Sequence, residues 1–276
     1  VENGFLRVAS PTNKSATFAF ALGGTQRFSS SINLPNHCRT PLVSGSTLSH
    51  WLGNDPQVVV KHDTAYFQTT SLVPSYRAVV SPTSAVVNSL VSTYTPLQQS
   101  NHSPEMGTAG FHLSIGILPE WDVLYLTSAS QKTYSGLIIN AYSAGRYGIH
   151  FRDETTNRPF AFSSYPNLVA GEGSGISGIG ASSTNSYTPT ASGTSPPQWA
   201  ISHHPSLGFM AYLVTGRWYF MEEVQFVATV NYLKQTDTMR ITTQGIFQSA
   251  AGASTTRGAA WAIRSLAQAA CITPDS

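Results

Sequence analysis

The sequence predicts an α+β protein in which an N-terminal antiparallel β-sandwich or small barrel precedes an incomplete, toroid-like domain of α/α hairpins. Two observations predict this class. Short runs rich in Val, Phe, Tyr and Thr, broken by Gly, Pro and Asn, fill the first part of the chain. A helical pattern then appears twice and begins a third time. We therefore expect a β-rich domain over 1–95, a linker over 96–110 and a helical-hairpin domain over 111–276.

The strands expected in the first half are short. Apolar and polar residues alternate most clearly at 16–20 and 64–68. Strands this short and this often interrupted favour an antiparallel sheet over βαβ units. The expected strands are residues 5–9, 16–22, 58–60, 64–70, 76–80 and 85–94.

The second half repeats one type of helical hairpin. An apolar helix ends in Thr-Ser or Thr-Gly, and a second helix then opens with aromatic residues. Gly145 and Gly216 stand where a glycine often ends a helix. A hairpin of this type cannot bury its apolar face alone, so the repeats predict a stack or a ring. The expected helices are residues 117–127, 134–144, 205–215, 218–233 and 257–270.

A long insert separates the two complete hairpins. Residues 169–197 consist almost wholly of Gly, Ser, Thr, Ala and Pro. Loops of this length are usually lids, binding loops or disordered segments. A functional loop and a disordered surface loop both remain open interpretations.

The composition excludes several classes of function. Only 10% of residues are charged and the net charge is +2, with no basic cluster that would bind nucleic acid. No apolar run is long enough to span a bilayer, and no signal peptide is visible. The abundance of Ser and Thr at low charge is common in extracellular, cell-surface and virion proteins. Cys38 and Cys271 are expected either to form one disulfide or to be two buried thiols.

The densest polar cluster follows the first hairpin. His150 is a candidate general base, Tyr147 an acid or sugar contact, and Arg152 a cation that neutralises a carboxylate. Asp153 would orient His150 or Arg152. These four residues form the set that a polysaccharide lyase needs. The alternative interpretation is a salt-bridged surface turn.

A second set of candidates lies around the second hairpin. His203 and His204 precede a helix that carries Tyr212, and residues at this boundary would face the mouth of a ring. Glu222 begins a Glu-Glu pair that could supply one carboxylate of a glycosidase. Helix capping, a satisfied core histidine and the helix dipole explain the same residues without a site.

Aromatic residues complete the candidate site. Trp218 and Trp261 are candidates to stack on sugar rings, although large aromatics at helical spacing are more often core. No HExxH or paired CxxC spacing is present, so no metal is expected. The glycine-rich residues 171–180 lack the strand, helix and Lys of a phosphate cradle, so no cofactor is expected.

Four stretches of the helical half resemble a set of uncharacterised proteins from proteobacterial genomes and their prophages. They are LPEWDVLYLTS, AGRYGIHFRDE, HHPSLGFMAYLVTGRWYFMEEVQF and TTRGAAWAIRSLAQAACITPD. The layout of a β domain followed by helical hairpins is also similar to exo-acting rhamnogalacturonan lyases and heparinase-like lyases. The first resemblance implies an association with phage or the cell envelope and no particular activity. The lyase toroid usually has more hairpins than this chain.

The sequence thus predicts a carbohydrate-active protein that binds, and if catalytic cleaves, an extracellular or envelope polysaccharide by β-elimination or glycosidic hydrolysis. The alternative is a non-catalytic structural protein of a phage virion or extracellular assembly, whose partners are copies of itself or other virion or envelope components. A third alternative is an adhesin that binds glycan without cleaving it.

Overall fold

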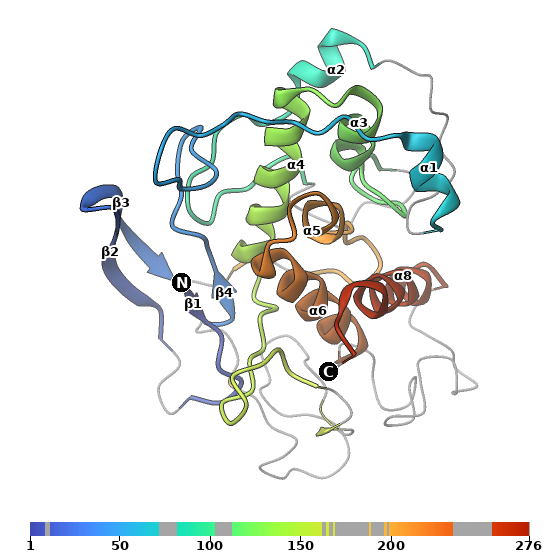
Figure 1. Ribbon diagram of the computed structural model, residues 1–276. Helices are drawn as coiled ribbons and strands as arrows, with labels where there is room; N and C mark the ends of the chain where they lie inside the picture. The colour runs from blue at the N-terminus through green and yellow to red at the C-terminus, as the bar shows by residue number, and fades with distance from the viewer. Residues whose placement is uncertain are drawn as a thin grey trace.

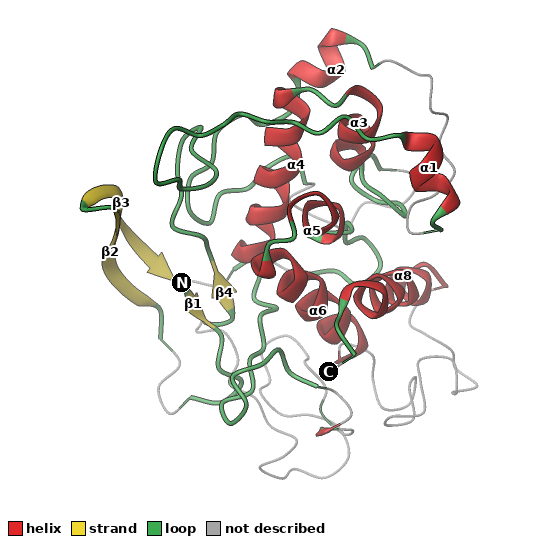
Figure 2. Cartoon of the chain, viewed as in Figure 1, coloured by secondary structure: helices red, strands yellow, loops and turns green. Residues whose placement is uncertain are grey.

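The computed structural model describes residues 1–8, 12–71, 82–102, 112–161, 164–165, 168, 188, 196–197, 199–233 and 256–275. Helices and small antiparallel sheets occur together, which agrees with the predicted α+β class. The helices gather in one body and the strands lie at its side (Figures 1 and 2).

Two small antiparallel sheets lie in the N-terminal part of the chain. Strand β1 (Glu2–Asn3) pairs with β4 (Cys38–Arg39), and β2 (Lys14–Leu22) pairs with β3 (Thr25–Leu34). The expected strand at 16–22 is therefore confirmed within β2. Each described sheet has two strands, and these sheets do not make up the predicted sandwich or small barrel. Of the expected strand at 5–9, only Phe5 forms an isolated bridge.

Two of the expected strands are helices, so these predictions were wrong. Residues 64–70 contain α1 (Thr64–Thr69), and residues 85–94 contain part of α2 (Ser84–Asn88). Each helix is initiated by a capping side chain: Asp63 accepts a hydrogen bond from the Tyr66 amide, and Thr83 accepts one from the Val86 amide. Such caps stabilise the first turn more than weak alternation favours a strand. Residues 58–60 form no strand, and 76–80 lie outside the described residues.

The helices of the second half are confirmed close to their predicted limits. Ser130 and Thr133 form a capping box at the start of α4. The observed helices are α3 (Glu120–Ser128), α4 (Gln131–Ser143), α5 (Phe209–Thr215), α6 (Trp218–Leu233) and α8 (Thr256–Ile272). Each packs against the next in this order, which agrees with stacked hairpins. No described helix combines the length and apolar character needed to cross a bilayer.

The two glycines expected to end helices behave differently. Gly216 takes a left-handed conformation with φ of 63° and ends α5, as predicted. Gly145 instead lies in η1 (Ala144–Arg146), a 3-10 turn that continues α4. A Cβ atom at Gly145 would lie 1.9 Å from the carbonyl oxygen of Arg39, so this glycine allows β4 to approach the helix end. The prediction for Gly145 was wrong because close packing, not helix termination, requires the glycine.

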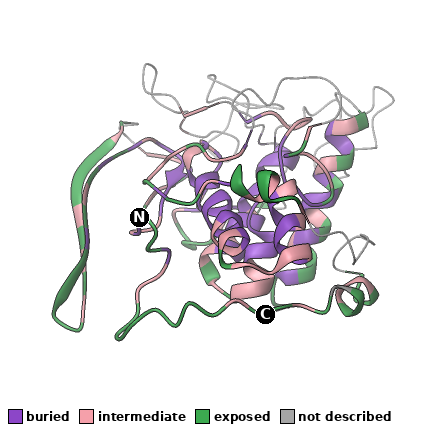
Figure 3. Ribbon diagram, turned by 90° about the horizontal axis from the view of Figure 1, so that it is seen from above, coloured by how far each residue is buried: buried purple, intermediate pink, exposed green. Residues whose placement is uncertain are grey.

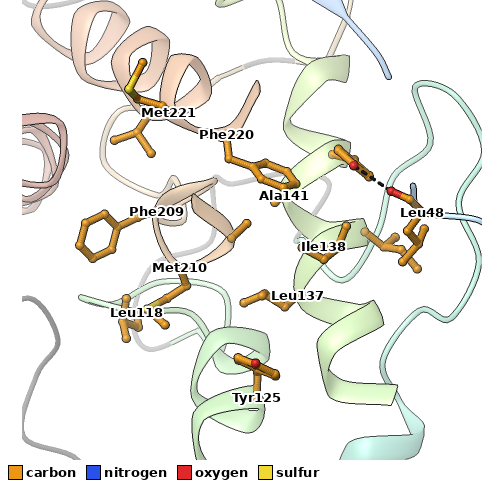
Figure 4. Packing of buried hydrophobic residues seen from close by; sticks show 14 of the residues in the cluster. Leu48, Leu118, Tyr125, Leu137, Ile138, Ala141, Phe209, Met210, Phe220 and Met221 are labelled. Atoms are coloured by element: carbon orange, nitrogen blue, oxygen red, sulfur yellow. Dashed lines mark hydrogen bonds between the residues drawn. The ribbon is translucent and has the colours of Figure 1, made fainter. Parts of the chain in front are cut away.

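The main core lies between α4 and the helices around it. Helix α4 contributes Leu137, Ile138 and Ala141, and α5 and α6 contribute Phe209, Met210 and Phe220 (Figure 4). The loop residue Leu48 reaches the same cluster, and its carbonyl oxygen accepts a hydrogen bond of 3.0 Å from the Tyr142 hydroxyl. The N-terminal half is therefore tied directly to the helical core.

The β2–β3 hairpin forms an arm beside this body. Seen from above, it stands apart from the helices and is largely exposed (Figure 3). Phe28, Ile32 and Leu34 on one face are buried against Cys38 and neighbouring loops. The opposite face is exposed and carries the small or polar residues Ser15, Thr17, Ala19, Ala21, Ser29, Ser31 and Asn33.

The two cysteines are not bonded to each other. Cys38 is buried and Cys271 is exposed on α8. The predicted disulfide is therefore absent, and the alternative of two buried thiols holds only for Cys38. Burial raises the pKa of the Cys38 thiol, so this side chain behaves as a small core residue.

Candidate functional site

Two of the predicted catalytic residues, His150 and Arg152, belong to a buried network of charged side chains. It joins β1, β4, the loop after η1 and α6 through Glu2, Arg39, His150, Arg152, Glu222 and Glu223. Arg152 binds two carboxylates, with Nε 2.6 Å from Glu2 Oε1 and Nη1 2.8 Å from Glu222 Oε1. Its second Nη donates to both carboxylates as well. Arg152 therefore already has carboxylate partners within the protein.

His150 is equally enclosed. Its Nδ1 lies 2.8 Å from the carbonyl oxygen of His37, and its Nε2 lies 2.9 Å from Glu223 Oε1. Neither His150 nor Glu223 is exposed to solvent. Both ring nitrogens face acceptors of the protein, so His150 presents no free nitrogen to a substrate.

Arg39 completes the network from the N-terminal half. Its guanidinium lies 3.7 Å from the centre of the Tyr219 ring, and its Nη1 lies 3.2 Å from Glu222 Oε2. Removing one partner of such a buried set costs about 3–5 kcal/mol, because a buried charge is then uncompensated. No pattern in the sequence indicated that Arg39 and Glu2 would take part. The network joins distant segments and holds the architecture together.

The remaining residues of the first predicted cluster serve local structure. Asp153 Oδ1 accepts backbone hydrogen bonds of 2.8 Å from Thr155 and Thr156, and Oδ2 accepts one of 2.9 Å from the Tyr165 hydroxyl. Burial alone would raise the pKa of Asp153, but these hydrogen bonds lower it overall. Tyr147 is fully buried and packs edge-on against Trp199.

The second predicted cluster lies elsewhere, between the loop before α5 and α8. His203 lies 2.7 Å from an Nη of Arg257, while His204 is buried, stacks on Trp199 and receives a hydrogen bond of 2.9 Å from Arg264. Trp261 lies under the Arg264 guanidinium. Burial lowers the pKa of His204 well below its usual value, and Arg264 lowers it further.

Two predicted residues remain apart from these groups. Tyr212 is partly buried and packs against the main core. Trp218 is 64% exposed at the start of α6. The predicted residues thus occupy several separate places and do not line one open cleft.

An open groove of about 430 Å³ is formed by other residues. Its walls come from the loop around Trp51, the first turn of α4 and the turn between α5 and α6. This volume lies within the range of about 300–1,000 Å³ that small-ligand pockets occupy. The lining residues are Ser46, Leu48, Ser49, His50, Trp51, Asp55, Pro56, Gln57, Val58, Gln131, Tyr134, Ser135, Val214, Thr215 and Arg217.

The groove combines an aromatic platform with planar polar side chains. Trp51 is 45% exposed, and its indole nitrogen donates a hydrogen bond of 3.0 Å to Ser49 Oγ. Asp55 Oδ1 accepts a hydrogen bond of 2.9 Å from the amide of Gln57, which has a left-handed φ of 53°. This turn fixes the Asp55 carboxylate and the Gln57 backbone at the groove wall. A backbone conformation that is unusual for a glutamine persists only where its surroundings require it.

Two opposite charges act on Tyr134 in the groove. Burial raises the pKa of the Tyr134 phenol, Arg217 lowers it and Asp55 raises it, and the overall shift is upward. Both charged groups line the groove together with Tyr134. Near neutral pH the phenol keeps its proton and can donate a hydrogen bond to a ligand.

Sequence reasoning missed this groove because three distant segments form it. One signal was present: Trp51 lies two residues before the turn residues Gly53, Asn54, Asp55 and Pro56. Within the described residues, no three His, Cys, Asp or Glu side chains are grouped in a way that could hold a metal ion.

Comparison with known proteins found no family, no curated protein and no solved structure that matches this chain.

Proposed function

We propose that the protein binds a saccharide, part of an extracellular or envelope polysaccharide, in the groove around Trp51. The observation that carries this proposal is the exposed Trp51 indole beside Asp55, Gln57, Gln131 and Arg217. The apolar face of a sugar ring packs on an aromatic plane, while planar amide, carboxylate and guanidinium groups hydrogen-bond its hydroxyls.

The position of the groove also supports the proposal. It lies where α4 begins and where α5 turns into α6, which is one end of the stacked hairpins. The incomplete toroid predicted from the sequence would open at such an end. We also propose that the hairpins form a toroid-like arrangement. We propose that the protein is located outside the cell, on the cell surface or on a virion.

The groove favours binding over hydrolysis. Asp55 is the one carboxylate among the described residues that line it, whereas glycosidic hydrolysis generally uses two. We therefore propose binding as the function, and cleavage by β-elimination or hydrolysis remains an outcome for product analysis to detect.

A glycan panel that includes neutral and acidic polysaccharides tests the proposal. Trp51→Ala should weaken binding at least tenfold, because the indole supplies most of the apolar contact. Trp218→Ala is the matched control, since Trp218 is also an exposed tryptophan but does not line the groove. Titration calorimetry measures both variants. Equal affinities of the two variants, or no glycan binding by the unaltered protein, would contradict the proposal.

A second candidate function is a structural role in a virion or extracellular assembly. The β2–β3 arm favours it, because a two-stranded hairpin is marginally stable alone and leaves strand edges unpaired within the described residues. Its exposed face carries hydroxyls that bond across the strands, such as Thr17 with Ser31 at 2.8 Å. Hydroxyls both donate and accept, so this face can pair with a copy of itself.

Sedimentation of the protein over a wide concentration range tests the assembly role. Self-association that Thr17→Lys abolishes would support it, because like charges on a two-fold face repel. The control is Ala65→Lys, because Ala65 is an exposed residue of α1 away from the arm. A monodisperse monomer at high concentration would argue against the assembly role and leave saccharide binding unaffected.

A further inference from the structure

Arg217 lines the groove and has no carboxylate partner among the described residues. Its Nη1 donates to two neutral oxygens, the Tyr142 hydroxyl at 2.8 Å and the Leu48 carbonyl at 3.2 Å. Within the part of the chain that the structure describes, its Nε and Nη2 make no hydrogen bond. The guanidinium therefore retains donors that can serve a ligand.

The core of the protein fixes this guanidinium in place. Tyr142 is buried within the main cluster, and its hydroxyl also donates to the Leu48 carbonyl (Figure 4). The Arg217 amide donates a hydrogen bond of 3.2 Å to Thr215 Oγ1, directly after the left-handed Gly216. A ligand that binds Arg217 has little side-chain freedom to remove, so more of the interaction appears as affinity.

Other arginines of the protein are neutralised in a way that Arg217 is not. Arg152 and Arg39 contact the carboxylate of Glu222, and Arg7 contacts Glu154. These pairs show the geometry that a guanidinium adopts with a carboxylate. At Arg217, the two hydrogen-bond partners are uncharged, and the residue lines the groove.

We propose that the groove selects an acidic saccharide, whose carboxylate binds Arg217. This inference rests on the proposed function and adds the class of sugar. A guanidinium matches a carboxylate through two parallel hydrogen bonds, and charge-assisted bonds are about twice as strong as neutral ones. Asp55 repels the same carboxylate, so it sets the direction in which the sugar lies. Asp55 and Gln57 then bind hydroxyl groups.

Three saccharides of equal length test the inference by calorimetry at constant ionic strength. They are an oligosaccharide of uronic acids, its neutral methyl ester and a sulfated neutral oligosaccharide. We expect the acid to bind about 10–100-fold more tightly than the ester, which corresponds to one charge-assisted contact. Arg217→Gln should remove this preference, so that the acid and the ester bind this variant with equal affinity.

Further variants keep the test decisive if Arg217→Gln folds poorly. Arg217→Lys retains the charge and loses the fork, so the acid should lose about threefold while a reduced preference over the ester persists. Tyr142→Phe releases one anchor of the guanidinium and should weaken the acid alone. Thermal unfolding followed by circular dichroism confirms that each variant is folded.

The outcomes separate this inference from the proposed function. Equal binding of acid and ester, with both lost in Trp51→Ala, overturns the acidic preference and leaves saccharide binding intact. A preference for the sulfated sugar overturns the assignment of a carboxylate. If none of the three saccharides binds and a wider neutral panel fails too, the proposed function itself is wrong.

Discussion

At the scale of single residues, close contacts between distant backbone segments dominate the structure. Gly145 brings the end of α4 against Arg39, whose guanidinium then reaches Tyr219 and Glu222. The absence of a side chain at Gly145 thus determines where the charged side chain of Arg39 can lie.

Gly145→Ala should destabilise the protein by about 3 kcal/mol or more, because the new Cβ atom would overlap the Arg39 carbonyl at 1.9 Å. The free energy of unfolding in urea measures the effect. Gly53→Ala is the control, since a Cβ atom there meets nothing within 4 Å and φ is not in the left-handed region. Similar stabilities for the two variants would contradict the packing argument.

At the scale of elements, the hairpin turns share a left-handed residue that is alanine in one case and glycine in the other. Ala129 ends α3 with φ of 45°, and Gly216 ends α5 with φ of 63°. In both, the amide donates back to the helix, from Ala129 to Tyr125 and from Gly216 to Tyr212. The two turns are therefore equivalent in backbone geometry and differ in conformational cost.

Ala129→Gly should raise the free energy of unfolding by about 1 kcal/mol, because it removes the steric cost of a left-handed alanine. Gly216→Ala should lower it by a similar amount, and open space around Gly216 means that only backbone strain contributes. Urea denaturation of the pair checks both signs. Changes in the same direction would show that packing, not backbone strain, determines the result.

The sequence was most reliable where periodicity is long. Helix α6 matches its predicted limits, since sixteen residues of apolar pattern leave little choice. Helix α1 was missed because six residues fit a strand as well as a helix, and only the cap at Asp63 distinguishes them.

The candidate site was harder to predict for a different reason. The residue types around His150 and Arg152 suit catalysis, but Glu2, Arg39 and Glu222 bind them from remote positions. A single sequence shows the types of side chain and does not show which distant partners satisfy them. The same limit concealed the groove, which Trp51 and Arg217 both line.

At the scale of the whole molecule, buried histidines make stability depend on pH. Burial lowers the pKa of His37 to about 4 and that of His102 to about 4, from about 6.5 in the unfolded chain. The unfolded state therefore binds more protons between pH 6.5 and pH 4. The stability that these neutral histidines contribute is fully present above pH 6.5, and it declines as the pH falls through this window.

The free energy of unfolding should fall by about 2 kcal/mol per histidine between pH 7 and pH 5. Urea unfolding at several pH values measures the decline. His102→Gln should reduce the loss by about 2 kcal/mol, because this position no longer titrates in the unfolded state. A variant whose stability depends on pH as steeply as that of the parent protein would contradict the assignment.

The arginine that bridges Glu2 and Glu222 also has a consequence for the order of folding. Glu2 of β1 pairs with Arg152 and Arg39, and both arginines also pair with Glu222 of α6, so the whole network forms only when α6 is in place. The helices contact their neighbours in sequence and can assemble earlier, since local contacts need little loop closure. During synthesis the completed network must therefore wait for α6, and until then Arg39 and Arg152 lack the carboxylate of Glu222.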